Sequence, residues 1–267
     1  MTAPPVAPPH AARLAVEVFE HPGAETDLVL LHGWAMHGGI FGTLIGRLKP
    51  YYRIHCVDLP GHGLNRDCDV PMGLDACAEA IAQVVPAGAV WCGWSLGGLI
   101  ALHAAHTGVP MQRLVMLCAS PCFVKQDDWR YGVSAEIFRD FAHGLRTDWH
   151  ATLDRFIALE AFGSDHAREE LRTLRDQVLA RGAPNPSVLA DGLDLLKQSD
   201  LRSVLPGLSL PTTWIAGRRD RLVDPRAMQE ATALCTHADV HVIEHAGHAP
   251  FLTHGDAVVA ALRGTAV

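Results

Sequence analysis

The segment Ala89-Val90-Trp91-Cys92-Gly93-Trp94-Ser95-Leu96-Gly97-Gly98 decides how this chain of 267 residues folds. It begins with four apolar residues, as in a buried strand, and residues 99–105 after it have the apolar spacing of a helix. Between them, the pattern Gly-x-Ser-x-Gly predicts a sharp turn from strand to helix, where only very small residues fit two positions on either side of the serine. Such a turn lifts the serine hydroxyl out of the sheet, so Ser95 is the candidate nucleophile.

Working outward from this turn, apolar strand patterns alternate with helical stretches along most of the chain. Strands that alternate with helices predict an α/β fold, in which a mostly parallel central sheet is flanked by helices on both faces. Besides the helix at 99–105, the periodicity predicts one helix at 74–84. Strands are expected at residues 14–19, 28–31, 53–57, 89–92, 114–118, 212–216 and 240–243.

The segment 123–201 interrupts this alternation. It has helical periodicity, many charges and few β-branched runs, and strand patterns return only after it. We therefore expect a helical cap, or lid, at 123–201, inserted into one core that is built from 14–122 and 202–267. Residues 1–13 are rich in proline, do not resemble a secretory signal, and are expected to form a flexible tail.

Composition and charge exclude several classes of function. Hydrophobic residues make up 49% of the chain and charged residues 19%, which is typical of a globular protein and not of a disordered one. A net charge of −7 offers no general attraction to nucleic acid phosphates. No apolar stretch suits a membrane span, because the longest uncharged one contains a proline and several glycines. We expect a monomer that binds neither nucleic acid nor membranes.

Cysteine and histidine patterns bear on compartment and on metal binding. The seven cysteines are an odd number without C-x-x-C pairs, which predicts reduced thiols in a cytoplasmic protein. Of the sixteen histidines, two pairs are spaced three residues apart, at 103 and 106 and at 245 and 248. Neither pair has the carboxylate or cysteine partners of a zinc site, so we expect no metal and no cofactor.

A serine nucleophile needs a histidine to take its proton and a carboxylate to orient that histidine. On a strand-to-helix turn of this kind, the partners follow in the order Asp or Glu and then His. Asp220 follows the strand at 212–216, and His248 lies in a Gly-His-Ala-Pro-Phe loop. Asp224 is the alternative acid, but it directly precedes a proline and suits a helix cap. His245 is the alternative base and is expected at the surface or in a supporting place.

Two backbone N–H groups should stabilise the negative charge that develops on the substrate oxygen. The N–H of Leu96 lies at the start of the helix after Ser95, where the helix dipole favours negative charge. The second N–H should come from the loop after the strand at 28–31, where Trp34 is the natural choice. The indole of Trp34 could line the acyl site or pack in the core, and the sequence leaves both readings open.

Four motifs together carry a resemblance to a known family: Leu31-His32-Gly33-Trp34, Asp58-Leu59-Pro60-Gly61-His62-Gly63, Gly93-Trp94-Ser95-Leu96-Gly97-Gly98 and His248-Ala249-Pro250-Phe251. With them, the chain resembles the BioH family of pimeloyl-[acyl-carrier protein] methyl ester carboxylesterases, within the α/β hydrolases. The resemblance runs from about residue 16 to the C-terminus and includes the cap segments 154–160 and 192–197. It implies an α/β-hydrolase fold with a cap, and a serine esterase that needs no cofactor.

The resemblance also implies a substrate and a partner. The substrate would be the methyl ester of a pimeloyl group on acyl carrier protein, and its hydrolysis would free the carboxylate for biotin synthesis. Docking of the carrier would use Arg155, Arg168 and Arg172, although Ala151 stands where a further arginine is expected. The substrate contacts implied are Trp34, Ser95, Leu96, Phe156, Ile157, Ala158, Leu159, Glu160 and His248.

Other readings remain open at this point. The same scaffold also serves general short-chain carboxylesterases, thioesterases and C–C bond hydrolases, and a non-catalytic ligand receptor can share the fold. The cap arginines could instead form helix-surface ion pairs with acidic neighbours. These neighbours are Asp154, Asp165, Glu169, Glu170 and Asp176.

Overall fold

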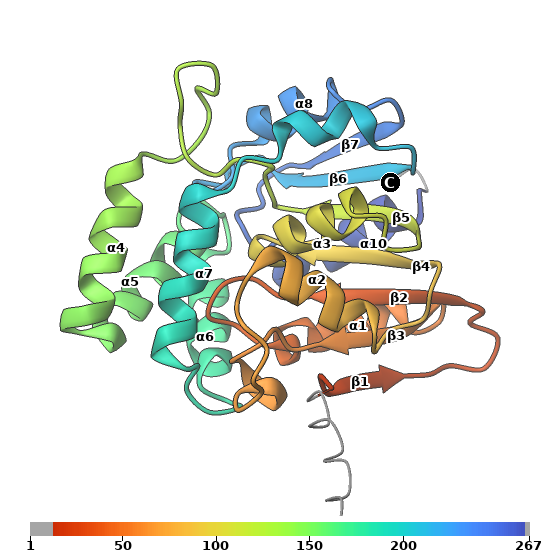
Figure 1. The fold of residues 1–267 in the computed structure, drawn as a ribbon, viewed down its shortest axis with the longest axis horizontal. Helices are drawn as coiled ribbons and strands as arrows, with labels where there is room; N and C mark the ends of the chain where they lie inside the picture. The colour runs from red at the N-terminus through yellow and green to blue at the C-terminus, as the bar shows by residue number, and fades with distance from the viewer. Residues whose placement is uncertain (1–12, 265–267) are drawn as a thin grey trace, which may run out of the picture.

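The computed structural model describes residues 13–264, and a seven-stranded sheet in the order β1-β3-β2-β4-β5-β6-β7 forms its centre (Figure 1). β1 pairs antiparallel with β3, and every other neighbouring pair is parallel, so the predicted mostly parallel sheet is confirmed. Every expected strand is present, with boundaries that differ by a few residues. The strands are β1 (Val16–Phe19), β2 (Thr26–Leu31), β3 (Tyr52–Val57), β4 (Ala89–Trp94), β5 (Met111–Leu117), β6 (Thr212–Gly217) and β7 (Ala238–Ile243).

Helices cover both faces of the sheet, as expected for buried parallel strands (Figure 1). α2 packs on α3, and α1 packs on α10 behind the sheet in this view. α1, α9 and α10 were not predicted from the sequence; α1 has only seven residues, two of them glycines, which weaken a helical pattern. These helices are α1 (Gly42–Leu48), α2 (Leu74–Ala82), α3 (Leu96–His106), α8 (Pro225–Thr232), α9 (Pro250–Thr253) and α10 (Gly255–Arg263).

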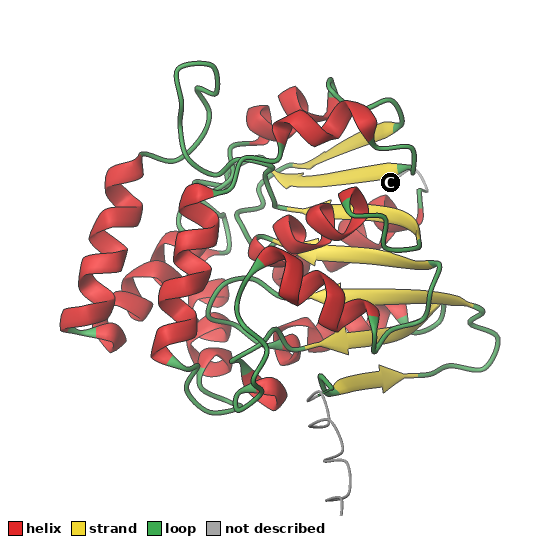
Figure 2. Cartoon of the chain, viewed as in Figure 1, coloured by secondary structure: helices red, strands yellow, loops and turns green. Residues whose placement is uncertain are grey.

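Four further helices lie between β5 and β6 in the chain and stand beyond the carboxyl ends of the strands (Figure 2). Side chains cap three of their starts: Ser134 accepts a hydrogen bond from the N–H of Glu136, Asp148 from that of Ala151, and Asn185 from that of Ser187. These helices lie within the segment 123–201, for which a cap is predicted, whereas of the expected tail 1–13 all but the last residue lies outside the described residues. The cap helices are α4 (Ala135–Thr147), α5 (Trp149–Ala161), α6 (Ala167–Val178) and α7 (Pro186–Gln198).

Arg181, in the loop between α6 and α7, fastens the cap to the core. Its guanidinium lies 3.1 Å from Asp58 and 2.6 Å from Glu17, and the side chain of Asp58 is only 1% exposed. Asp58 also accepts hydrogen bonds from the N–H groups of Gly38 and Leu64. A buried carboxylate needs such partners, so the cap supplies part of the compensation for a charge that belongs to the core.

We expect Arg181→Gln to lower the free energy of unfolding by about 3 kcal/mol, the lower end of the range for breaking a buried pair, because two backbone donors still support Asp58. Arg175→Gln is the matched control, since Arg175 forms an exposed pair with Asp154 at 2.8 Å and should contribute under about 1 kcal/mol. Urea unfolding of the two variants measures the difference. Equal losses would show that burial of Asp58 does not matter.

Candidate active site

The turn at Ser95 is the most constrained piece of backbone in the site. Ser95 directly follows β4 and has φ 53° and ψ −117°, a conformation that non-glycine residues rarely adopt. A Cβ on Gly93 would overlap the carbonyl of Gly97, and a Cβ on Gly97 would overlap the carbonyl of Leu31. The two glycines of the motif are therefore required by close contacts, and the predicted strand-to-helix turn is confirmed.

Asp220 and His248 form a buried pair beyond the ends of β6 and β7. Nδ1 of His248 lies 2.7 Å from Oδ2 of Asp220, and both side chains have no solvent exposure. The other oxygen of Asp220 accepts hydrogen bonds from the N–H groups of Leu222 and Val223, at 2.8 and 2.9 Å. Three donors thus compensate the carboxylate, and because Nδ1 carries the proton shared with Asp220, Nε2 is left to accept one.

His248 is also held beside the Ser95 turn. The indole N–H of Trp94 donates to the carbonyl of His248 at 2.8 Å, and the two rings lie 5.6 Å apart. Nε2 of His248 is buried without a partner, so no hydrogen bond joins it to the hydroxyl of Ser95 in this structure. In enzymes without substrate, this bond is often long and tightens when the substrate binds.

The backbone N–H groups of Trp34 and Leu96, the predicted oxyanion donors, belong to the two segments that meet at the Ser95 turn. Leu96 is the first residue of α3, and the loop after β2 lies against the turn, since a Cβ on Gly33 would be 3.3 Å from that of Ser95. Within the described residues, neither N–H donates to a backbone carbonyl or a side chain. Both donors remain available for a negatively charged oxygen.

The cap covers both of these residues. The indole of Trp34 is buried, donates to the carbonyl of Leu189 in α7 at 2.8 Å, and packs against Phe156 of α5 with ring centres 4.6 Å apart. Gly192 of α7 approaches so closely that a Cβ there would lie 3.0 Å from the indole of Trp34 and 3.3 Å from Leu96. The Trp34 side chain therefore joins the core loop to the cap.

The alternative acid and base have other roles, as the sequence predicted. Asp224 caps α8: it accepts a hydrogen bond from the N–H of Arg226 at 2.9 Å and pairs with the guanidinium of the same residue. His245 is 63% exposed and lies 2.8 Å from Asp165. Neither side chain joins the buried pair of Asp220 and His248.

The cap stretch 156–160 lies in α5, and only part of it faces inward. Phe156, Ile157 and Glu160 are buried, Leu159 is half-buried, and Ala158 is exposed. This follows from the helical period, which puts residues one, three and four apart on one face and turns the residue between them outward. The inward face of this stretch thus consists of two apolar side chains and one carboxyl group.

Glu170 is one of the acids that the alternative reading pairs with cap arginines on exposed helix faces, and the structure does not place it there. The residue is fully buried, and its Oε1 accepts hydrogen bonds from the hydroxyls of Ser164 and Thr253 at 2.8 and 2.7 Å. Burial raises the pKa of Glu170 above its ordinary value. The signal was present in the sequence, because Glu170 shares one helix face with Leu174 and Val178, which are also buried.

The three arginines Arg155, Arg168 and Arg172 are exposed on the cap. Within residues 13–264, none of them lies within 4.0 Å of a carboxylate, whereas Asp154 and Asp165 pair with other arginines. The structure therefore does not support the interpretation that these three arginines only form ion pairs on the helix surface. Arg155 donates a hydrogen bond to the hydroxyl of Thr152 at 3.3 Å, and the exposed guanidinium groups of all three can still meet an external anion.

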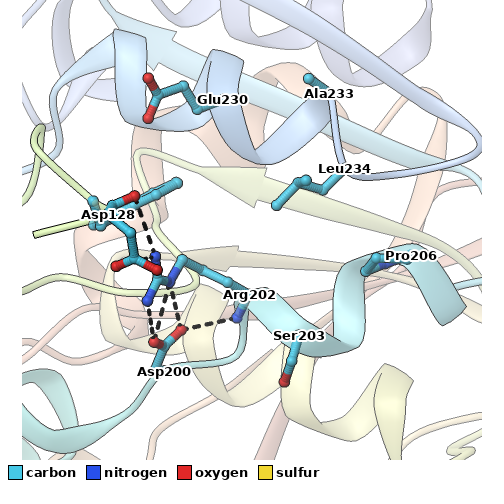
Figure 3. A pocket seen from close by; sticks show the side chains of 9 residues that line it. Asp128, Asp200, Arg202, Ser203, Pro206, Glu230, Ala233 and Leu234 are labelled. Atoms are coloured by element: carbon cyan, nitrogen blue, oxygen red, sulfur yellow. Dashed lines mark hydrogen bonds and ion pairs between the residues drawn. The ribbon is translucent and has the colours of Figure 1, made fainter. Parts of the chain in front are cut away.

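A pocket of about 760 Å³ lies away from all these residues, between α8 and the segments that enter and leave the cap (Figure 3). In it, Arg202 pairs with Asp200 at 2.6 Å and with Asp128 at 2.9 Å, and lies over the ring of Trp129. These contacts join the two cap connections, and the pocket contains none of the predicted site residues. We therefore place the candidate active site at Ser95, Asp220 and His248.

Metal-binding clusters and membrane-spanning helices are both absent from the part of the chain that the structure describes. Residues 13–264 contain no group of three or more histidine, cysteine, aspartate or glutamate side chains that could hold a metal ion. Over the same residues, no helix is both long and apolar enough to cross a membrane.

Comparison with known proteins agrees with this geometry. The model of the Alpha/beta hydrolase family matches residues 28–261, so the chain is an α/β hydrolase. Similar solved structures include a hydrolase from Oleispira antarctica (TM-score 0.82, 19% identity) and an esterase from Exiguobacterium antarcticum (TM-score 0.79, 21% identity), each match covering 94% of both chains. At these identities the likeness bears on the fold alone.

Curated relatives define the family more closely. A pimeloyl-[acyl-carrier protein] methyl ester esterase of Stenotrophomonas maltophilia (strain R551-3) is 52% identical over 92% of this chain and 94% of its own. One of the same name from Xanthomonas campestris pv. campestris (strain B100) is 51% identical over 92% and 96%. The chain belongs to the family of pimeloyl-[acyl-carrier protein] methyl ester esterases, as the sequence motifs indicated, and is a carboxylic ester hydrolase.

The assignment of the acid makes a direct prediction. Asp220→Asn should lower kcat about 10⁴-fold, because the amide stabilises the wrong imidazole tautomer while leaving the fold intact. Asp224→Asn is the control, since asparagine also caps helices and the residue does not contact His248. Hydrolysis of a p-nitrophenyl ester by both variants measures the effect, and a large loss in the Asp224 variant alone would reverse the assignment.

Proposed function

We propose that this chain hydrolyses the methyl ester of a pimeloyl group carried by acyl carrier protein, and so frees the pimeloyl carboxylate for biotin synthesis. The observation that carries the proposal is the buried pair of Asp220 and His248 beside the strained turn at Ser95. The names of the relatives supply the substrate.

The proposed reaction passes through an acyl-enzyme. The hydroxyl of Ser95 attacks the ester carbonyl while Nε2 of His248 takes its proton, and Asp220 stabilises the resulting imidazolium. The N–H groups of Trp34 and Leu96 hold the oxyanion. Methanol leaves with the proton from His248. Water then attacks the acyl-serine with His248 again as base, which releases the carboxylate and restores the serine.

The pimeloyl chain would lie between the cap and the core. Its ester end would contact Trp34, Ser95, Leu96 and His248. The inward side of the stretch 156–160 would line the chain, and the exposed position of Ala158 makes it the weakest of these contacts. The buried rings of Phe141 and Phe156, 5.5 Å apart, support an apolar lining on the cap side.

The carrier protein would dock on the cap through Arg155, Arg168 and Arg172. Arg168 and Arg172 line a surface pocket of about 490 Å³, and all three lack carboxylate partners within the described residues. Acyl carrier proteins are acidic, and guanidinium groups pair well with carboxylate and phosphate. Ala151, exposed at the start of α5, removes one charge from this surface.

We further propose that the enzyme acts as a monomer in the cytoplasm and without a cofactor. All seven cysteines are free thiols, which suits a reducing compartment. The proposed chemistry needs only side chains, backbone N–H groups and water.

Two measurements test the proposed function. Ser95→Ala should abolish ester hydrolysis and labelling by a fluorophosphonate, and normal activity in this variant would refute the nucleophile. Turnover of the carrier-bound methyl ester should exceed that of p-nitrophenyl acetate. Indifference to the carrier-bound substrate would favour a general esterase, and a folded chain that no fluorophosphonate labels would favour a ligand receptor.

The proposed docking of the carrier protein on Arg155, Arg168 and Arg172 can be tested separately. The double change Arg168→Ala/Arg172→Ala should lower the ratio of kcat/KM for the carrier-bound ester to kcat/KM for a small ester about tenfold, because two charge contacts with the carrier are lost. Arg139→Ala on α4 is the control, since Arg139 is paired with Glu136. An unchanged ratio at low salt would place the carrier elsewhere.

A further inference from the structure

The pocket of about 760 Å³ beside α8 takes no part in the proposed reaction and has a lining of its own. Figure 3 shows Glu230 and Leu234 on one side of it, and Asp200 and Arg202 on the opposite side. Glu230 belongs to α8, Leu234 follows that helix, and Arg202 begins the 3₁₀ helix Arg202–Gly207. Small-molecule sites have volumes of about 300–1,000 Å³, so this pocket is large enough for a second ligand.

One part of the lining is apolar. Trp129 is buried beneath Arg202, whose guanidinium carbon lies 5.4 Å from the ring centre. Leu234 is 43% exposed, and Pro206 and Ala233 in the same lining are exposed as well. Contact with hydrocarbon would remove this apolar surface from water, which is favourable. The pocket therefore suits a ligand with an apolar body.

Arg202 does not make the pocket an anion site, because its donors are already in use. Nε donates to Asp200 at 2.8 Å, and Nη2 to the same carboxylate at 2.6 Å. Nη2 also donates to Gln126 at 3.1 Å, and Nη1 lies 2.9 Å from the carboxylate of Asp128. All three nitrogens of the guanidinium thus have acceptors, so an incoming anion would have to displace two carboxylates.

The charge that remains in the pocket is negative. Its lining contains three carboxylates, those of Asp128, Asp200 and Glu230, and one guanidinium. The hydrogen bond from Arg202 lowers the pKa of Asp200, which keeps that carboxyl group ionised. Glu230 is half-buried, and within residues 13–264 its side chain has no hydrogen bond and no ion pair. A cation in the pocket would be attracted by this excess of negative charge.

We propose that this pocket is a second ligand site and binds a small organic cation, an amine with an apolar body. The ammonium group lies at Glu230, and the hydrocarbon lies against Leu234 and Pro206. The site is separate from the active site and does not depend on the proposed function. Because its walls come from α8 and from both connections of the cap, a bound cation contacts core and cap together.

The test uses phenethylamine as the probe and phenethyl alcohol, which has the same apolar body and no charge, as its matched control. An NMR titration of the isotope-labelled full chain at neutral pH follows the backbone amide signals. We expect the amine to bind with a Kd on the order of 1 mM and the alcohol about tenfold more weakly. The signals that move should be those of Ser203, Ala233 and Leu234, and the Kd should stay the same after a fluorophosphonate has labelled the chain.

A pair of variants separates local from general attraction. Glu230→Gln should weaken amine binding about fivefold, as expected for the loss of one partly exposed charge contact, and should leave alcohol binding unchanged. Glu79→Gln is the control: it removes the same charge from a smaller pocket of about 310 Å³ at α2, and amine binding should not change.

Three results would overturn the proposal. Equal Kd values for the amine and the alcohol would show that the pocket does not recognise charge. Equal weakening in the two variants would reduce the effect to the net charge of the chain. Shifts at the Ser95 turn, or loss of binding after fluorophosphonate labelling, would place the amine in the active site.

Discussion

The site depends on one steric constraint, the close packing of the start of α3 against the ends of β2 and β4. A Cβ on Gly93 or Gly97 would overlap backbone atoms, a Cβ on Gly33 would lie only 3.0 Å from the ring of Trp94, and Ser95 is held at a positive φ. Strain of this kind persists only where the surrounding structure determines the backbone completely. The same packing sets the N–H of Leu96 at a helix N-terminus and brings the loop of Trp34 against the turn. One contact region therefore fixes the proposed nucleophile and both proposed oxyanion donors.

A similar contact brings the acid and the base together. A Cβ on Gly217, at the end of β6, would overlap the carbonyl of Gly247, so the loops that follow β6 and β7 lie directly against each other. Because neighbouring parallel strands end at one edge of the sheet, Asp220 and His248 meet there although 28 residues separate them. The indole of Trp94 then links this pair to the Ser95 turn. The rigid sheet thus fixes the positions of the loops, and the loops carry the reactive side chains.

Much of this arrangement could be predicted from the sequence, because local chemistry decides it. Glycines two positions from Ser95 admit few other conformations, and the proline after Asp224 favours a helix cap over a catalytic role for that residue. The cap was harder. Its helices could be recognised by period, but an amphipathic pattern does not say which acid on the boundary of a face is buried. For this reason the burial of Glu170 was not predicted, and the ion pair of Arg181 with Asp58 joins segments too far apart for any local pattern.

The two buried acids of the cap illustrate how stability and function divide between neighbouring residues. Glu170 accepts hydrogen bonds from two hydroxyl groups and links α6 to α9, so its burial stabilises the fold. Glu160, ten residues earlier, lies next to the loop of His248 without any partner within the described residues, and an apolar residue of similar size would pack there at lower free energy. Natural sequences keep such violations of local rules mainly at functional sites, where a bound molecule supplies the missing contact.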